Sequence, residues 1–237
     1  VLHETGHALY DYGLPGNWRR QPVGEALGMS IHESQSLLIE MQVCRSPEFI
    51  RSIAPMIRET FGKHALALNE DNLLRRYHRV ERSLIRVEAD EVTYASHVIL
   101  RYQLEKEIIS GELLPADLPS AWREGMRKFV GVEPSDDREG CLQDIHWYGG
   151  DFGYFPTYTL GAVCAAQFFE AATRDDPKIL SGIASRDFGP LYDWLRLNVH
   201  SFGRLLPAPA LIQRATGKKL GTEAFKSHLN ARYLGAD

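Results

Sequence analysis

The sequence has few cysteines and no long apolar run, and each of these shortages excludes a class of protein. Its three cysteines, Cys44, Cys141 and Cys164, are odd in number and show no C-x-x-C spacing. We therefore expect reduced thiols in a cytoplasmic protein rather than a disulfide framework. No apolar stretch approaches the roughly 18 residues that a membrane span needs, and no signal peptide is visible. A membrane partner is not expected.

The sequence also lacks an excess of positive charge. The formal net charge is -4 and no basic stripe stands out, which argues against a nucleic-acid partner. Internal repeats and low-complexity linkers are missing from the sequence too. With 237 residues, 44% of them hydrophobic and 24% charged, the chain has an ordinary globular composition. It fits one large domain, or a piece of a larger one.

Strand-like alternation is scarce, and the apolar spacing instead predicts a mainly α-helical fold. Ser30 is a plausible N-cap, Pro47 suits a first helical turn, and Gly111 suits a helix end. Residues 72–110 form either one long helix or two abutting helices, and residues 131–156 are expected to be irregular. The other expected helices cover residues 2–12, 30–44, 47–61, 115–130, 157–173, 187–200, 207–216 and 221–234.

The chain opens with an H-E-x-x-H motif at His3, Glu4 and His7. Residues four apart on a helix project from the same face, so His3 and His7 can reach one metal ion. Glu4 lies at the edge of that face, where it can address a metal-bound water rather than the metal. The alternative is a pair of ordinary surface histidines on a helix.

A catalytic zinc usually has three protein ligands and one open position, so a third ligand is needed. Glu33 fits this role because it lies on the next expected helix, beside the polar residues His32, Ser34 and Gln35. Zinc would lower the pKa of a bound water from about 15.7 toward about 7. Glu4 would take the proton and pass it to the leaving amine. Taken alone, Glu33 would more often be an ordinary solvated helix residue.

Two later segments carry further polar chemistry. Arg86 and Asp90 are four residues apart, which on a helix predicts either a functional pair or a surface ion pair worth a few tenths of a kcal/mol. The segment Gly140–Trp147 brings an amide, a carboxylate, an imidazole and an indole into one loop. Such a dense set of polar groups suits a site better than a linker.

A glycine- and tyrosine-rich stretch, Tyr148–Tyr158, follows this loop. Its glycines allow a close approach of the backbone to a ligand. The hydroxyl of Tyr154 or Tyr158 can stabilise a tetrahedral oxyanion. An aromatic core position is the alternative for each of these two tyrosines.

Together these motifs resemble the Taq-type metallocarboxypeptidase family. The family pattern is H-E-x-x-H, then H-E-S/G-Q, then I-R-x-x-A-D, then G-x-x-Q-D-x-H-W. All four occur here in that order, at His3–His7, His32–Gln35, Ile85–Asp90 and Gly140–Trp147. The resemblance therefore covers residues 3–147, while the remaining residues are compatible but carry little diagnostic weight.

The resemblance implies a mostly helical fold with a deep substrate cleft and with zinc, or sometimes cobalt, at its floor. It implies the release of single C-terminal amino acids from peptide substrates by a cytoplasmic homodimer. His3, His7 and Glu33 would hold the metal, and Glu4 would be the catalytic base. Zinc and cobalt share this ligand set, so the sequence leaves the choice of metal open.

The same resemblance assigns roles on the substrate side. Arg86 would bind the terminal carboxylate, a task that suits the forked donors of a guanidinium. His146 would contact the substrate carbonyl or oxyanion, while Tyr154 and Tyr158 are both weaker candidates for that contact. Three further residues are expected to support substrate or ligands: Gln35, Gln143 and Asp144.

One family motif, D-x-R-x-T, should precede the metal helix and does not occur before it here. The chain also begins without methionine, two residues before His3, although a frayed first turn holds a side chain poorly. We therefore expect 1–237 to be one catalytic domain that lacks an N-terminal portion. We also expect this polypeptide alone to be weakly active or inactive.

Two alternatives stay open at this point. A related helical zinc oligopeptidase or dipeptidyl carboxypeptidase would use the same metal ligands but cut at a different bond. A noncatalytic peptide-binding fragment would keep the motifs by descent alone. The presence of Glu4 argues against the second alternative, because a binding module has no use for a base.

Overall fold

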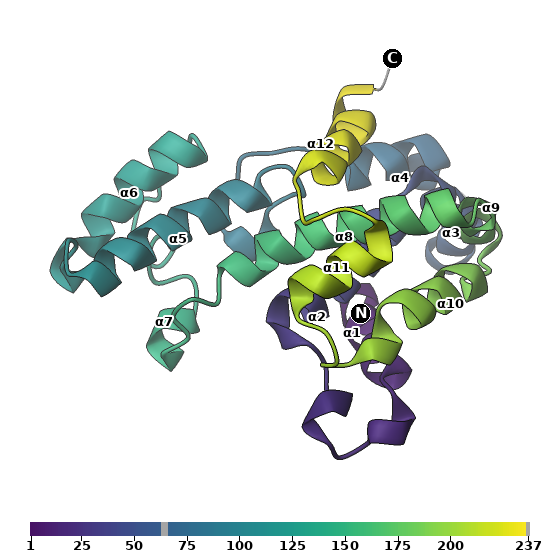
Figure 1. The fold of residues 1–237 in the computed structure, drawn as a ribbon. Helices are drawn as coiled ribbons and strands as arrows, with labels where there is room; N and C mark the ends of the chain where they lie inside the picture. The colour runs from purple at the N-terminus through teal and green to yellow at the C-terminus, as the bar shows by residue number, and fades with distance from the viewer. Residues whose placement is uncertain (63–65, 236–237) are drawn as a thin grey trace. The chain divides into compact units, whose positions relative to one another are not determined.

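The computed structural model describes residues 1–62 and 66–235, and within these ranges the chain forms helices and no strands (Figure 1). The predicted mainly α fold is therefore confirmed. Contacts along the chain group into two compact units. Unit 1 contains Val1–His78 together with the chain from Leu160 onward, and unit 2 contains Arg79–Thr159. That both units belong to one catalytic domain stays a prediction.

Unit 1 holds most of the helices. Its α-helices are α1 (Leu2–Gly13), α2 (Gly28–Leu37), α3 (Pro47–Phe61), α4 (Glu70–Tyr77), α8 (Pro156–Asp175), α9 (Lys178–Ser185), α10 (Gly189–Asn198), α11 (Ala208–Thr216) and α12 (Glu223–Asn230), with α8 beginning just before the unit boundary. Shorter turns complete it: the 3-10 helices η1 (Gly16–Trp18), η2 (Pro22–Gly24), η4 (Leu66–Leu68) and η7 (His200–Phe202), and the π-helices η3 (Leu38–Cys44) and η8 (Ala231–Gly235).

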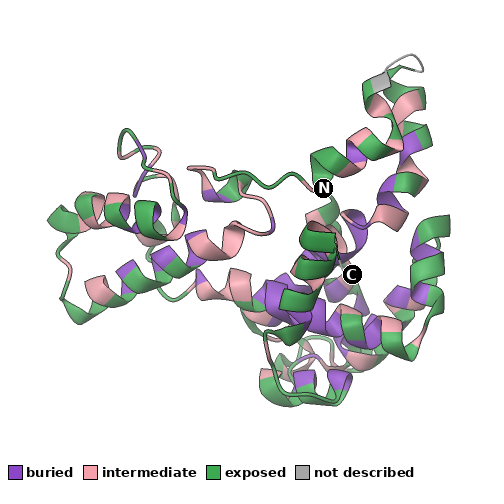
Figure 2. Ribbon diagram, turned by 90° about the horizontal axis from the view of Figure 1, so that it is seen from above, coloured by how far each residue is buried: buried purple, intermediate pink, exposed green. Residues whose placement is uncertain are grey.

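The main core of unit 1 surrounds α8, the long green helix of Figure 1. Residues 161–168 of α8 are all buried, and they include several small side chains that let neighbouring helices approach closely. Fully buried Tyr10 of α1 and Leu38 of η3 belong to the same core. Buried and exposed residues alternate around the helices, as Figure 2 shows, which is the arrangement expected when one face of each helix packs inward.

Unit 2 is smaller and is built on the pair α5 (Tyr94–Ser110) and α6 (Leu118–Phe129). Leu100 and Leu104 of α5 pack with Trp122 and Met126 of α6 in its core. Gly125 permits the close contact, because a Cβ atom there would overlap the Leu100 side chain. The remaining elements of unit 2 are η5 (Arg86–Glu88), η6 (Pro115–Asp117) and the short α7 (His146–Gly149).

Several predicted helix ends are confirmed, but two predictions are wrong. The helix at 47–61 begins at Pro47, and α5 ends before Gly111, which adopts a left-handed conformation. Ser30 is not an N-cap, since α2 begins at Gly28 and then continues into a π-helix. Residues 72–110 are neither one helix nor two abutting helices, because α4 ends at Tyr77 and α5 begins only at Tyr94.

Asp90 explains the interruption between α4 and α5. Its carboxylate accepts hydrogen bonds from the backbone N–H groups of Glu81, Val92 and Thr93. Short polar side chains that bond the backbone in this way stabilise turns in competition with helix. The predicted pairing of Arg86 with Asp90 across a helix face is therefore wrong, and Arg86 lies in η5 with other partners.

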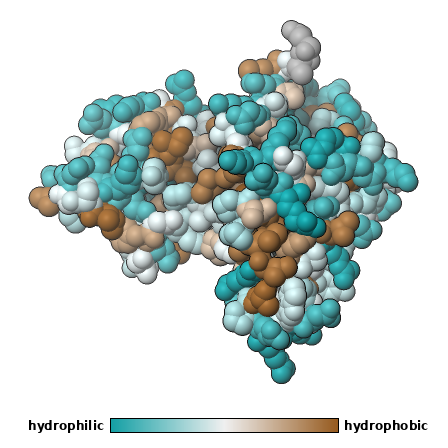
Figure 3. Space-filling view, in the orientation of Figure 1, coloured by the Kyte–Doolittle hydropathy of each residue, from teal (hydrophilic) through white to brown (hydrophobic). Residues whose placement is uncertain are grey.

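The outer surface mixes polar and apolar residues. Figure 3 shows brown apolar patches scattered among teal polar residues on the face that it presents. Among the described residues, every helix is too short or too polar to extend across a lipid bilayer.

Candidate metal centre and arginine cluster

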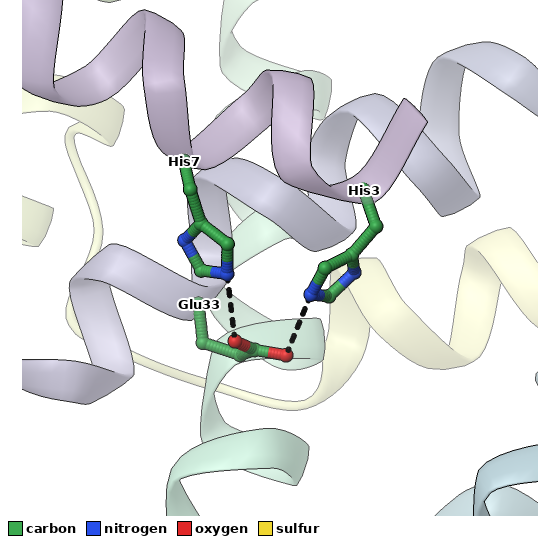
Figure 4. Close-up of side chains that lie close together, drawn as sticks. All are labelled: His3, His7 and Glu33. Atoms are coloured by element: carbon green, nitrogen blue, oxygen red, sulfur yellow. Dashed lines mark ion pairs between the residues drawn. The ribbon is translucent and has the colours of Figure 1, made fainter. Parts of the chain in front are cut away.

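Two helices of unit 1 bring His3, His7 and Glu33 together. The Nε2 atom of His3 lies 3.7 Å from one carboxylate oxygen of Glu33, and Nε2 of His7 lies 3.4 Å from the other (Figure 4). One donor atom from each of the three residues lies within 4.8 Å of the others. Ligands about 2.0–2.2 Å from a tetrahedral zinc are separated by roughly 3.4 Å, which is close to the two distances between the histidines and Glu33.

Two glycines allow this convergence. Gly6 of α1 faces the backbone of α2, where a Cβ atom would collide with the carbonyl group of Gln35. This close approach brings the histidines of α1 within reach of α2. On the other side, a Cβ atom at Gly161 of α8 would lie 2.9 Å from Cγ of Glu33. The carboxylate arm therefore lies in a space that α8 leaves open only because residue 161 is glycine.

His3 is held from outside by an acid that the sequence analysis missed. Its Nδ1 atom lies 2.9 Å from a carboxylate oxygen of Glu40, and the second oxygen of Glu40 accepts a 2.6 Å hydrogen bond from Arg45. A sequence signal did exist, since Glu40 follows Glu33 by two helical turns and such residues share a face. Helical spacing alone did not identify its partner.

His7 is held by a second histidine. Nδ1 of His7 lies 2.5 Å from Nδ1 of His32, and Nε2 of His32 lies 3.2 Å from a carboxylate oxygen of Asp11. His32 belongs to the H-E-S-Q motif, but the motif alone did not indicate a role for it. Asp11 follows His7 by one turn of α1, which places both on one face of that helix.

Burial and hydrogen bonding shift the pKa values of the centre. Desolvation raises the pKa of Glu33, which is 5% exposed, and the proximity of His3 only partly offsets this effect. The hydrogen bond to Glu40 raises the pKa of His3, whereas burial and the nearby His32 lower the pKa of His7. A buried carboxylate that faces two imidazoles is the donor set of a zinc site, and a bound cation would favour its ionised form.

Glu4 and Gln35 occupy different environments. Glu4 is exposed on α1 and lies outside the converging donor set, as expected for a base rather than a ligand. Gln35 is 2% exposed, and its amide contacts Nε2 of His200 at 2.9 Å and the hydroxyl of Ser34. It therefore supports α2 from inside the protein, and its predicted contribution to substrate binding stays a prediction.

Unit 2 contains a buried cluster in which two arginines share one carboxylate. Arg86 donates from Nε and from one terminal nitrogen to Asp144, the latter at 2.7 Å. Arg101 donates from Nε to the other oxygen of Asp144 at 2.6 Å. Arg86 is 5% exposed and Arg101 is fully buried. Asp144 is well placed to orient Arg86, because the contact uses two neighbouring donors of the guanidinium.

Gln143 ties this cluster to the surrounding backbone. Its side-chain oxygen accepts from the backbone N–H of Arg86 and from the guanidinium of Arg101, at 2.9 and 2.8 Å. Its amide nitrogen donates to the carbonyl groups of Leu84 and Glu139. The loop of Gly140–Trp147 and the segment that carries Arg86 are thereby fixed together, so the predicted polar loop does assemble with Arg86.

The aromatic candidates lie around the same cluster. Nε2 of His146 lies 3.0 Å from the Tyr158 hydroxyl, and the Arg86 guanidinium stands 4.8 Å from the centre of the Tyr158 ring. The ring of Tyr154 lies 5.4 Å from those of both His146 and Tyr158. Burial, followed by the charge of Arg86, lowers the pKa of His146 and favours its neutral form. Tyr158 thus has the more direct contacts of the two tyrosines.

Helices that gather two histidines and a glutamate around one point define a candidate metalloenzyme. The family model for carboxypeptidase Taq (M32) metallopeptidases matches residues 1–233. The chain belongs to this M32 family of metallopeptidases, as its motifs predicted.

Individual relatives agree with this assignment. The chain is 43% identical over 237 residues to thermostable carboxypeptidase 1 of Thermus thermophilus, which covers 98% of this chain and 46% of that protein. The M32 carboxypeptidase structure from Deinococcus radiodurans R1 matches with a TM-score of 0.94 at 40% identity, over 98% of this chain and 47% of that one. Trypanosoma cruzi metallocarboxypeptidase 1 matches with a TM-score of 0.94 at 39% identity, over 98% and 49%. The chain spans about half the length of these relatives.

Proposed function

We propose that this chain is the metal-binding part of a zinc-dependent carboxypeptidase that releases single amino acids from the C-termini of peptides. The observation that carries the proposal is the convergence of His3, His7 and Glu33 from two helices. Membership in a metallopeptidase family supports it, and so do the names of relatives that are carboxypeptidases. Cobalt suits the same ligands and is the alternative metal.

His3, His7 and Glu33 would hold the ion, and Glu4 would move the proton. When bound, zinc supplies Lewis-acid polarisation of a carbonyl oxygen and makes water more acidic. A carboxylate oxygen of Glu4 accepts the proton of the attacking water and then donates it to the leaving amine nitrogen. Its exposed position on α1, one residue from His3, leaves that oxygen accessible.

Arg86 would bind the terminal carboxylate of the peptide. Asp144 holds its guanidinium from one side, and the Tyr94 hydroxyl accepts from its remaining terminal nitrogen at 2.7 Å. These contacts fix the plane of the guanidinium before substrate arrives, which reduces the entropy lost on binding. His146 would contact the substrate carbonyl or oxyanion, with Tyr158 or Tyr154 as a second donor.

The substrate, assembly and location belong to the same proposal. We propose peptides as the substrates, a homodimer as the assembly and the cytoplasm as the location. The absence of a nucleic-acid partner is also a prediction, which the net charge of -4 supports.

Digestion of a hexapeptide by the longest product of the gene tests the proposal. A ladder in single-residue steps from the C-terminus, observed by mass spectrometry, would support it. Steps of two residues would instead identify a dipeptidyl carboxypeptidase, and internal cuts an oligopeptidase. No cleavage at all, with peptide binding retained, would favour the noncatalytic fragment. The same assay on residues 1–237 alone tests the expectation that this polypeptide is weakly active.

A further inference from the structure

We propose that Glu40 and His32 are positioning residues that hold His3 and His7 with the proton on Nδ1, so that both rings present Nε2 to the metal. The inference rests on the proposed metal centre and adds two residues outside its ligand set. Each ring has two nitrogens, and in the neutral ring only one of them can bind a metal. The hydrogen-bond partner of Nδ1 therefore decides which ring nitrogen is available to the metal.

For His3 the partner is unambiguous. A carboxylate has no proton to give when ionised, so the 2.9 Å contact requires Nδ1 of His3 to be the donor. In the neutral ring the lone pair then lies on Nε2, the atom that faces Glu33. Arg45 donates to the other oxygen of Glu40 at 2.6 Å. This contact holds Glu40 in the position that orients the ring.

For His7 the proton assignment passes through His32. Asp11 accepts from Nε2 of His32, so the neutral His32 ring carries its proton there and has a lone pair on Nδ1. That lone pair can accept only if Nδ1 of His7 donates across the 2.5 Å contact. Nε2 of His7 is then unprotonated and faces the second oxygen of Glu33. Both neutral rings therefore carry the proton on Nδ1, although their hydrogen-bond partners differ.

The hydrogen bonds that position His3 and His7 differ in strength. The side chains of Glu40 and Arg45 are only 27% and 23% exposed, whereas that of Asp11 is 60% exposed. Solvent competes more strongly for an exposed hydrogen bond. Loss of Glu40 should therefore weaken metal binding more than loss of Asp11. Outer partners of metal-binding histidines typically contribute about 10- to 100-fold in affinity.

Zinc affinity of the longest product of the gene, measured by competition with a chromogenic chelator, tests the proposal without any need for activity. Glu40→Gln and His32→Ala should each weaken binding about 10- to 100-fold, and Asp11→Asn should weaken it less. His32→Asn keeps an oxygen acceptor for Nδ1 of His7 and should recover part of the loss. Glu170→Gln and His228→Ala make matched changes elsewhere in unit 1 and should leave affinity unchanged.

A second measurement keeps the proposal testable if a variant does not fold. Nitrogen NMR of the metal-free wild-type chain reports the tautomer of each imidazole directly. His3 and His7 should both carry the proton on Nδ1, and zinc should then shift the Nε2 resonances. A proton on Nε2 of either ring in the neutral state would overturn the proposal.

The possible failures are distinguishable. Unchanged zinc affinity in folded Glu40→Gln and His32→Ala would overturn the positioning roles and leave the metal centre intact. Absence of zinc binding by the folded wild-type chain would overturn the proposed metal centre, and the positioning roles with it.

Discussion

The metal centre of unit 1 and the arginine cluster of unit 2 are built in opposite ways. The metal centre uses ligands on α1 and α2, and its histidine side chains remain 20–30% exposed. The arginine cluster joins Arg86 and Arg101 to Asp144 over sequence separations of 58 and 43 residues, and both arginines are buried. The first region is open to an ion and a reactant. In the second, two buried guanidinium groups share one carboxylate inside the protein.

This difference implies different consequences of mutation. An exposed base such as Glu4 can be replaced with a small effect on folding, because water solvates what remains. In the buried cluster, loss of one partner leaves an uncompensated charge in the interior. The comparison therefore predicts loss of activity without unfolding in one region and unfolding in the other.

The largest effect is expected from Glu4→Gln in the longest product of the gene. A glutamine cannot accept the proton, so kcat should fall about 10²- to 10⁴-fold while the melting temperature stays unchanged. Steady-state kinetics and thermal unfolding check both parts. Glu59→Gln, a matched change at an exposed position of α3, should leave both quantities unchanged. Full activity of Glu4→Gln would show that the base lies elsewhere.

The second prediction concerns Asp144→Asn, which leaves two buried guanidinium groups without their shared carboxylate. The free energy of unfolding should fall by about 3–5 kcal/mol, measured by urea denaturation. Asp137→Asn is the matched control in the same unit, because Asp137 forms an exposed ion pair with Arg123. Its effect should stay below about 1 kcal/mol. Equal effects for the two variants would remove the distinction between the regions.

The third prediction concerns the pH dependence of stability, through a buried histidine of unit 2. Burial and the nearby Arg101 guanidinium lower the pKa of His97 to about 4. In the unfolded chain this pKa is about 6.5, so the unfolded state binds more protons at mildly acidic pH. The contribution of neutral His97 to the free energy of unfolding should therefore be fully present above pH 6.5. It should decline as the pH falls from 6.5 to about 4, by about 3 kcal/mol in total.

The variant His97→Gln isolates this contribution. Its unfolding free energy should vary less between pH 6.5 and about 4 than that of the wild type, with the difference measured by urea denaturation at each pH. The same pH dependence in both proteins would mean that other groups are responsible.

The smallest effect is expected from Gly161→Ala. The new methyl group would lie 2.9 Å from Cγ of Glu33, so the side chain must move. Such overpacking typically lowers stability by about 1–3 kcal/mol. Zinc affinity should fall as well, because the carboxylate is displaced. Gly16→Ala is the control, since nothing lies within 4 Å of a Cβ atom there. Wild-type affinity in Gly161→Ala would show that α8 does not constrain Glu33.

The two regions also differ in how far the sequence predicted them. His3, His7 and Glu33 could be grouped because helical spacing is regular and the ligand chemistry is specific. Arg86 and Asp144 were each identified from motifs, but their contact depends on long-range packing that local spacing does not encode. Arg101 was missed, since a single arginine within a helix has no distinguishing pattern in the sequence.

Competition between side-chain hydrogen bonds and helix hydrogen bonds limited the prediction of the fold. The mainly helical class followed from the apolar spacing, and most helix positions agreed. The helix expected through Arg86 failed because the Asp90 carboxylate bonds backbone N–H groups that a helix would use. Ser30 resembled an N-cap by residue type alone, but α2 begins at Gly28, two residues earlier.

The central claim is that one ion binds jointly to His3, His7 and Glu33. Anomalous diffraction at the zinc edge, from crystals of the zinc-loaded protein, tests it most directly. One strong peak is expected about 2.0–2.2 Å from Nε2 of both histidines and from a Glu33 oxygen. A peak elsewhere, or a Glu33 side chain turned away from the ion, would contradict it.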